Sequence, residues 1–309
     1  MTKIDSRIAV IVVNYGTADL AVKAVESVLK NSTPGMSLEI HLVDNASPGN
    51  DAEQLANAHA EHGWGNQVEL YLESKNHGFG RGNNLVLQKL ASRENPPEFV
   101  FLLNPDAKLE NDAINVLADA LEADRDAAAA GAGISFPDGS PAVACFRFPT
   151  LLREIVGAIN FGPLARLLPQ ASVALPPEWD GPVDWVAGAS VLMRFDSLAE
   201  VGFFDPDFFL YFEEVELMRR LRRAGYRTLY VPEARVTHIA GAATQVASHD
   251  IRPKRQPAFV YDSWRMYFQK AHGRGYALLT ALLRLPAAWL GIGLSWLRGR
   301  RSELPIGFS

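Results

Sequence analysis

Polar side chains follow apolar runs at four places in this 309-residue chain, and they are the first candidates for chemistry. The four groups are Asn14-Tyr15, Asp44-Asn45, the loop 76–84 and Asn104-Pro105-Asp106. Because ligands of open α/β sheets bind beyond the carboxyl ends of the strands, the four groups could line one crevice. Within it, Asp44 could accept a hydrogen bond from a nucleobase or a ribose, or it could be an ordinary turn residue.

A carboxylate and a histidine could together hold a metal ion. Asp106 follows an apolar run and Pro105, and one protein carboxylate plus substrate phosphate oxygens is a common arrangement for Mg²⁺ at nucleotide sites. His238 could supply a second ligand, and an imidazole would favour Mn²⁺. The alternatives stay open, because Pro-Asp is also turn chemistry and a lone histidine is often structural.

The run Glu213-Glu214-Val215-Glu216 carries the most informative acids. On a helix, Glu214 shares a face with Leu217 and Leu221, so it lies on the stripe that should face the core. Favourable charge at a helix N-terminus explains Glu213 and Glu216 better than Glu214, and Glu216 can pair with Arg220 at i, i+4. Aromatic neighbours would raise the pKa of Glu214 toward the range of a general base.

The loop 76–84 carries Gly78, Gly80 and Gly82, but Asn83 stands where a dinucleotide fingerprint has its third glycine. The loop could let the backbone approach a diphosphate before a helix N-terminus, or it could be a flexible turn.

Alternating strand-like and helix-like segments position these residues. Strands are expected at Ile8–Val13, Ile40–Val43, Val68–Leu72, Phe99–Leu103 and Thr228–Val231, and helices at 20–29, 52–62, from the glycine loop to about 91, and 213–224. This rhythm predicts an α/β fold with a mainly parallel sheet covered by helices on both faces. The proline-rich segment 137–182 is expected to be an irregular excursion over the core.

Composition limits the function classes. The chain is 48% hydrophobic and 21% charged, which indicates a folded globular protein, and its single cysteine, Cys145, can form no intramolecular disulfide, which favours a reducing, cytoplasmic compartment. The net charge is −5, yet residues 252–309 hold ten Lys/Arg and two acids, so that segment is +8 and the remainder −13. This polarity argues against nucleic-acid binding and for contact with an anionic membrane surface.

The C-terminal part is expected to be a helical, basic and apolar extension over 251–309, after a catalytic domain over 1–250. Residues 276–297 are almost wholly apolar, and Arg298, Arg300 and Arg301 follow. Arg284 and Pro286 argue against a clean membrane span, so segment 276–301 is expected to lie in a membrane interface, or else to pack on the catalytic domain or in a homodimer.

These motifs, in this order, resemble inverting family-2 glycosyltransferases of the GT-A fold, particularly the bacterial rhamnosyltransferase-like branch. The resemblance covers about Ile8 to Thr244. It is carried by Val12-Val13-Asn14-Tyr15, Val43-Asp44-Asn45, the segment 76–84, Leu103-Asn104-Pro105-Asp106, Trp185-Val186-Ala187-Gly188, Phe212-Glu213-Glu214 and Thr237-His238.

The resemblance implies a role for each motif. Asp106 would be the metal-binding end of a D-x-D element, with Asn104 in place of its first acid, and His238 would join the Mn²⁺ or Mg²⁺ site. The paired acids Glu213 and Glu214 would be the catalytic residues, with Glu214 as the base at a position where the family more often has Asp. Acceptor contacts are expected from Trp185 and Gly188. Donor contacts are expected from Asn14, Tyr15, Asp44, Asn76, Gly78, Gly80, Asn83, Asn104, Asp106 and Arg220.

The implied activity is transfer of a sugar, with L-rhamnose from dTDP-rhamnose as the best match, to a cell-envelope glycan or a polyprenyl-diphosphate-linked acceptor at the inner face of the plasma membrane. Two other classes stay open. A non-catalytic nucleotide-sugar binding protein would share the same motifs. A nucleotide-dependent oxidoreductase would need dinucleotide glycines after the first strand, and they are missing there.

Overall fold

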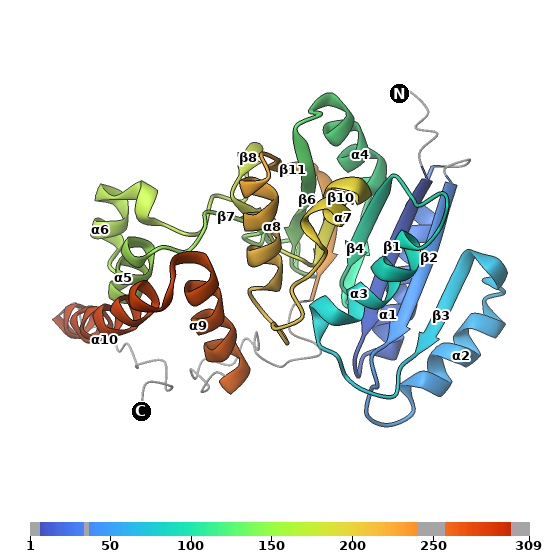
Figure 1. The fold of residues 1–309 in the computed structure, drawn as a ribbon, viewed down its shortest axis with the longest axis horizontal. Helices are drawn as coiled ribbons and strands as arrows, with labels where there is room; N and C mark the ends of the chain where they lie inside the picture. Colours follow the sequence, from blue (N-terminus) through green and yellow to red (C-terminus); the bar gives the residue numbers. More distant parts are fainter. Residues whose placement is uncertain (1–6, 34–36, 240–256, 298–309) are drawn as a thin grey trace.

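A twisted nine-stranded sheet forms the body of the protein in the computed structural model, which describes residues 7–33, 37–239 and 257–297 (Figure 1). Its path runs β3-β2-β1-β4-β10-β6-β11-β5, with β8 also paired to β11. The strands are β1 (Arg7–Asn14), β2 (Ser37–Asp44), β3 (Val68–Leu72), β4 (Phe99–Leu103), β5 (Ala107–Leu109), β6 (Ala127–Ser135), β8 (Gly181–Val183), β10 (Ser190–Arg194) and β11 (Arg227–His238).

Alternation along β1 explains the two layers of core. Ile8, Val10 and Val12 pack on one face with α1 (Ala18–Asn31), α2 (Asp51–Glu61) and α4 (Ala113–Ala123). The residues between them pack on the other face with α3 (Phe79–Ala91), α7 (Phe195–Val201) and α8 (Glu213–Arg223). A strand buried on both sides needs this continuous apolar sequence. The α/β prediction with helices on both faces is therefore confirmed.

The sheet is mixed in its second half. Strands β3, β2, β1 and β4 are parallel, as are β6 and β11, whereas β10 runs antiparallel between β4 and β6. This insertion brings the turn before β10 next to the carboxyl end of β4. Two expected segments differ in extent: helix α3 already begins at Phe79, inside the glycine loop, and β11 continues to His238.

The excursion 137–182 is more ordered than expected. It holds the helices α5 (Leu151–Ile159) and α6 (Gly162–Leu167) and the short strand β7 (Cys145–Phe146), which pairs with β9 (Trp185–Val186). Its helices form a separate group with α9 (Ala258–His272) and α10 (Arg274–Leu297), to one side of the sheet (Figure 1). The prediction of an irregular segment was wrong because α5 has an apolar stripe that α10 covers.

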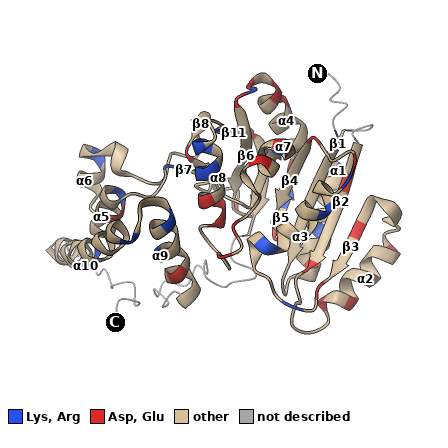
Figure 2. Cartoon of the chain, viewed as in Figure 1, with Lys and Arg blue, Asp and Glu red and all other residues tan. Residues whose placement is uncertain are grey.

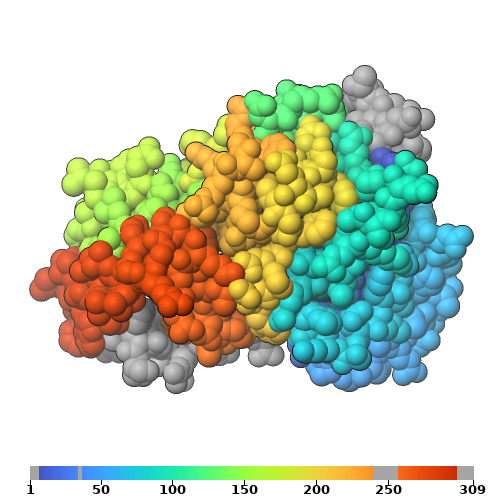
Figure 3. All heavy atoms as spheres, in the orientation of Figure 1, coloured from blue at the N-terminus to red at the C-terminus, as the bar shows by residue number. Residues whose placement is uncertain are grey.

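Helix α10 confirms the predicted C-terminal helix and contains Pro286. Of the described helices, it alone is long and apolar enough to cross a membrane, with a mean hydropathy of 1.7, and 28% of its most apolar window is buried. In Figure 3 the α9–α10 surface adjoins the excursion on one side and the segment before α8 on the other. The expected division at 250/251 and the basic residues after 297 lie outside the described residues.

Candidate functional site

The two predicted metal ligands lie in contact. The Oδ1 atom of Asp106 is 3.0 Å from the Nε2 atom of His238, and the Asn104 amide nitrogen is 3.3 Å from the same imidazole nitrogen. Main-chain pairing fixes this arrangement, since His238 is the register partner of Ala107 and the Ile239 N–H donates to the Asp106 carbonyl. Both side chains are largely buried, at 8% and 15% exposed for Asp106 and His238.

One carboxylate and one imidazole can hold Mn²⁺ or Mg²⁺ only if the remaining ligands come from water or a substrate. Within the described ranges, no group of three or more His, Cys, Asp or Glu side chains could hold a metal by itself. The donor set therefore fits a metal that arrives with a diphosphate, as the sequence predicts.

Two carboxyl groups lie side by side at the first turn of α8. Glu213 is 3% exposed, and one carboxyl oxygen of each of Glu213 and Glu214 has no exposed surface and no hydrogen-bond partner among the described residues. Burial raises the pKa of Glu214 to about 7. Burial, and then the neighbouring charge of Glu214, raise the pKa of Glu213 well above 4.5. A carboxyl group with a pKa near 7 can act as a general base at neutral pH.

Glu213 is thus not the solvated helix-terminus charge that its position in the helix suggests. The reason lies just before the helix, where Tyr211 and Phe212 have φ values of +67° and +68°. Left-handed backbone at bulky residues is strained and is concentrated at functional sites. Figure 2 shows the acids at the start of α8 and the basic residues at its other end.

The short loop Gly188-Ala189 borders the Asp106–His238 pair on one side and the Glu213–Glu214 pair on the other. The N–H of Asn104 donates to the carbonyl of Ala189 over 2.9 Å. At the adjacent Gly188, an added Cβ would lie 3.4 Å from the ring of Phe79 and 3.8 Å from the Cβ of Glu214. Gly188 therefore lies beside the predicted base. The Trp185 ring stacks on Phe146 at 4.1 Å.

The glycines of the loop approach protein rather than open space. A Cβ at Gly78, where φ is +77°, would lie 1.9 Å from the carbonyl oxygen of Phe209. At Gly80 it would lie 3.0 Å from the Cβ of Phe204, and at Gly82 it would lie 2.9 Å from Val13. The expected approach to a diphosphate is therefore not what requires these glycines. They let the start of α3 lie against β1 and the segment before α8.

The side-chain amides of Asn45 and Asn83 hold the loop 76–84 in place through hydrogen bonds. The Asn45 amide donates to the Asn76 side chain and to the Gly78 carbonyl, and its oxygen accepts from the N–H of His77. Asn83, 1% exposed, donates to the carbonyl of Phe79. Their role in the fold is to fix the loop, so any donor contact from Asn76, Gly78 or Asn83 stays a prediction.

Asn14 and Asp44 form a second polar network at the ends of β1 and β2. The Asn14 amide donates to the carboxylates of Asp44 and Asp51, and its oxygen accepts from Thr17. Asp44 also accepts from the N–H and hydroxyl of Ser47, which is the turn chemistry named as its alternative. Asn14 has no exposed surface, so we revise its role from donor contact to positioning of Asp44. The neighbouring Tyr15 is part-exposed.

Arg220 pairs with Glu216 as predicted, through its Nε and Nη2 atoms at 2.8–2.9 Å. Its terminal nitrogens also donate to the carbonyls of Val201 and Phe203. Because these contacts engage the guanidinium group of Arg220 with other groups of the protein, they favour a structural role for Arg220 over the expected donor contact.

Three positioning contacts were not predicted from the sequence. The Asn84 amide donates to the Phe204 carbonyl and accepts from its N–H, which fixes the chain entering the strained segment. From α9, the Ser263 hydroxyl donates to the carbonyl of Leu210 over 2.9 Å, and the Tyr267 ring lies 5.4 Å from that of Phe212. No spacing in the sequence links residues so far apart in the chain.

The chain is similar to known glycosyltransferase sequences. The family model described as "Glycosyl transferase family 2" matches residues 9–144. The N-acetylglucosaminyl-diphospho-decaprenol L-rhamnosyltransferase of Mycobacterium tuberculosis is 32% identical over 194 residues, 59% of this chain and 62% of that protein. The rhamnosyltransferase WbbL of Escherichia coli is 28% identical over 175 residues, 55% of this chain and 64% of that protein. The matches thus span less than two thirds of these relatives.

Among solved structures, the mannosyltransferase PcManGT from Pyrobaculum calidifontis, in complex with GDP-Man and Mn²⁺, superposes with a TM-score of 0.55. It is 17% identical, and the match covers 98% of this chain and 78% of that protein. At this identity the likeness shows the fold alone, and it confirms the expected GT-A architecture.

Proposed function

We propose that this chain, whose residues 9–144 match the family model "Glycosyl transferase family 2", transfers a sugar from a nucleoside-diphosphate donor to a hydroxyl group with inversion at the anomeric carbon. The proposal rests on one observation: the predicted metal ligands Asp106 and His238 and the acids Glu213 and Glu214 border the same loop. The Ala189 carbonyl accepts from the N–H of Asn104, and a Cβ added at the adjacent Gly188 would lie 3.8 Å from the Cβ of Glu214, so both pairs adjoin this loop.

Glu214 accepts the proton of the acceptor hydroxyl as that oxygen attacks the anomeric carbon. The bond from this carbon to the donor phosphate breaks, and its electron pair leaves with the nucleoside diphosphate. Asp106 and His238 would hold a divalent ion, Mn²⁺ or Mg²⁺, which when bound neutralises charge on the leaving diphosphate. Burial keeps the pKa of Glu214 close to neutrality, so the base is both strong enough and deprotonated enough to act.

The names of two relatives support a donor and an acceptor. Both are rhamnosyltransferases, which favours L-rhamnose from dTDP-rhamnose, and one name specifies a diphospho-decaprenol acceptor. A polyprenyl-diphosphate-linked acceptor would place the enzyme at the inner face of the plasma membrane. The exposed apolar helix α10 supports peripheral membrane contact through 276–301, of which residues 298–301 lie outside the described part.

The test is incubation of the full chain with a panel of sugar nucleotides, Mn²⁺ or Mg²⁺ and lipid-linked N-acetylglucosamine. We expect release of nucleoside diphosphate and transfer with inverted anomeric configuration, greatest with dTDP-rhamnose. Donor binding without hydrolysis or transfer for any sugar nucleotide would instead support a binding protein. Retention of configuration would contradict the role of Glu214.

A further inference from the structure

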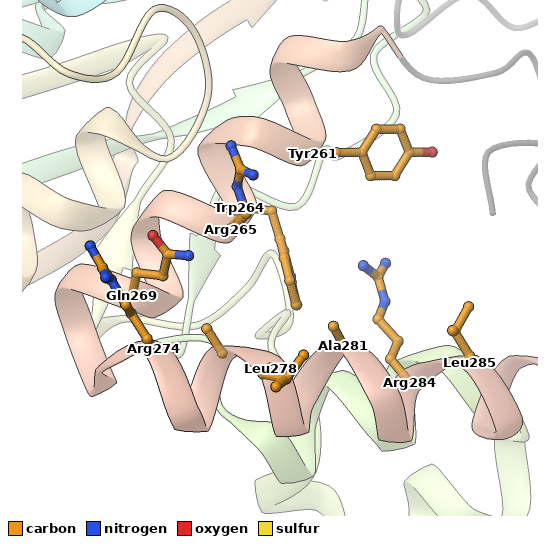
Figure 4. Close-up of a pocket in the computed structure, with 10 residues that line it drawn as sticks. Tyr261, Trp264, Arg265, Gln269, Arg274, Leu278, Ala281, Arg284 and Leu285 are labelled. Atoms are coloured by element: carbon orange, nitrogen blue, oxygen red, sulfur yellow. The ribbon is translucent and has the colours of Figure 1, made fainter. Parts of the chain in front are cut away.

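A groove of about 360 Å³ lies between α9 and α10, which form a helical hairpin joined at Gly273 (Figure 4). Trp264 projects from α9 toward α10, and Arg284 points from α10 back toward α9. The groove is lined by Tyr261, Trp264, Arg265, Gln269, Arg274, Ala277, Leu278, Ala281, Arg284 and Leu285.

The groove is lined by apolar side chains and by arginines. Its charged residues are three arginines, and no acidic side chain lines it. Arg284 is occupied, since it pairs with Glu154 at 3.3 Å and lies over the Trp264 ring at 5.6 Å. Arg265 is 63% exposed and pairs with the exposed Asp262 at 3.1 Å. Arg274 has no ion pair with any described carboxylate, and in Figure 4 both Arg265 and Arg274 lie on the side of Trp264 that is nearer the start of α10.

The groove opens beside an apolar surface. On α10, Leu278 is 62%, Leu282 57% and Trp289 63% exposed. Apolar surface of this extent on one helix indicates contact with a membrane or a partner. Arginines beside it fit phosphate oxygens, because the guanidinium fork can donate two parallel hydrogen bonds to a phosphate.

We propose that the groove binds one anionic phospholipid of the bilayer surface, with a hydrocarbon chain against Trp264 and Leu278 and the phosphate held by Arg265 and Arg274. Charge complementarity commits the site to an anionic lipid, since all the charged residues that line the groove are arginines and the exposed Arg265 and Arg274 stand near the apolar Trp264 and Leu278. The inference rests on the proposed membrane contact of α10 but not on glycosyl transfer, because binding needs no sugar nucleotide.

The test is flotation of the full chain with vesicles of phosphatidylcholine alone or mixed with phosphatidylglycerol. We expect binding to the mixed vesicles and a loss of roughly 30-fold in affinity for Arg265→Gln/Arg274→Gln, from about 1 kcal/mol for each basic side chain at an anionic surface. The matched control Lys23→Gln/Lys30→Gln removes two exposed charges from α1, on the sheet body, and should leave binding unchanged. Equal effects of the two double variants would overturn the proposal.

A second variant separates a groove from a simple apolar surface. Ala281→Phe adds apolar area to α10 but fills the groove, so it should weaken binding to mixed vesicles, whereas a surface that only lies on the membrane would bind as well or better. Free glycerol phosphate distinguishes a lipid from a soluble phosphate: it should not displace the vesicles at millimolar concentration. Unchanged or tighter binding by Ala281→Phe, or displacement by glycerol phosphate, would refute a lipid site. Vesicle binding and sugar transfer are measured separately, so either proposal can fail alone.

Discussion

Replacing Glu214 with Gln should lower activity and raise stability at the same time. The side chain keeps its shape but can no longer accept a proton. Loss of a general base lowers turnover by about 10²- to 10⁴-fold, and donor binding should change little, because Asp106 and His238 are untouched.

The stability effect follows from the raised pKa of Glu214. Its rise from 4.5 to about 7 corresponds to about 3 kcal/mol of free energy of unfolding. Because the folded-state pKa lies above the unfolded value, this stability is fully present below pH 4.5 and is lost as the pH rises through about 7. Gln mimics the protonated form, so the variant should match the wild type at pH 4 and exceed it by up to about 3 kcal/mol at pH 8.

The assays are steady-state release of nucleoside diphosphate and urea denaturation at both pH values. Wild-type turnover should rise with pH through about 7, as the carboxyl group loses its proton, and the variant should lack this rise. The matched control is Glu213→Gln. Burial, and then the neighbouring charge of Glu214, raise the pKa of Glu213 well above its ordinary value, and Glu213 is not the assigned base, so its replacement should preserve most of the turnover. Near-normal turnover of Glu214→Gln, with a large loss for Glu213→Gln, would refute the assignment of the base.

Three further variants test other parts of the site. Asp106→Ala should abolish the Mn²⁺-dependent part of nucleoside-diphosphate binding in isothermal titration, and undiminished binding would remove Asp106 from the metal site. Gly78→Ala should lower the free energy of unfolding by roughly 2–4 kcal/mol in urea denaturation, because its Cβ would meet the Phe209 carbonyl at 1.9 Å; a neutral result would contradict the close approach. Ser263→Ala should lower kcat with little change in the donor KM, since it frees the Leu210 carbonyl, and Ser263→Thr should restore it; equal loss in both would deny a positioning role.

Local patterns made the strands and most helices predictable. Continuous apolar runs such as Phe99–Leu103 can be buried on both faces only in a covered sheet, and the polar residues after them necessarily lie at its edge. Asp106 and His238 were both predicted as ligands of one metal, and the structure places them 3.0 Å apart, although the antiparallel β10 was not expected; the metal site itself stays a prediction. The role of Glu214 as base is still a prediction that the variants above address.

Contacts between distant segments could not be predicted. Favourable charge at a helix N-terminus was the expectation for Glu213, but α8 begins after left-handed backbone at Tyr211 and Phe212, and Glu213 is 3% exposed. The glycine spacing suggested a phosphate loop, yet the neighbour that needs Gly78 is Phe209, 131 positions further on. Such close approaches depend on which segments the fold brings together, and periodicity within one segment does not contain that information.

Helix α9 connects the strained segment before the acids to the α9–α10 groove. Two left-handed bulky residues cost on the order of 1–3 kcal/mol each, so contacts from outside the segment must hold them in place. Ser263 and Tyr267, four positions apart and both buried, supply such contacts from one face of α9. Tyr261 and Arg265, also four apart, line the groove from another face. Because a helix transmits displacement as a rigid element, a shift of α9 at the groove would act directly on the backbone that positions Glu213 and Glu214. The C-terminal hairpin is therefore part of the structure that holds the acids, and its removal should relax the segment 208–212 even with the sheet intact.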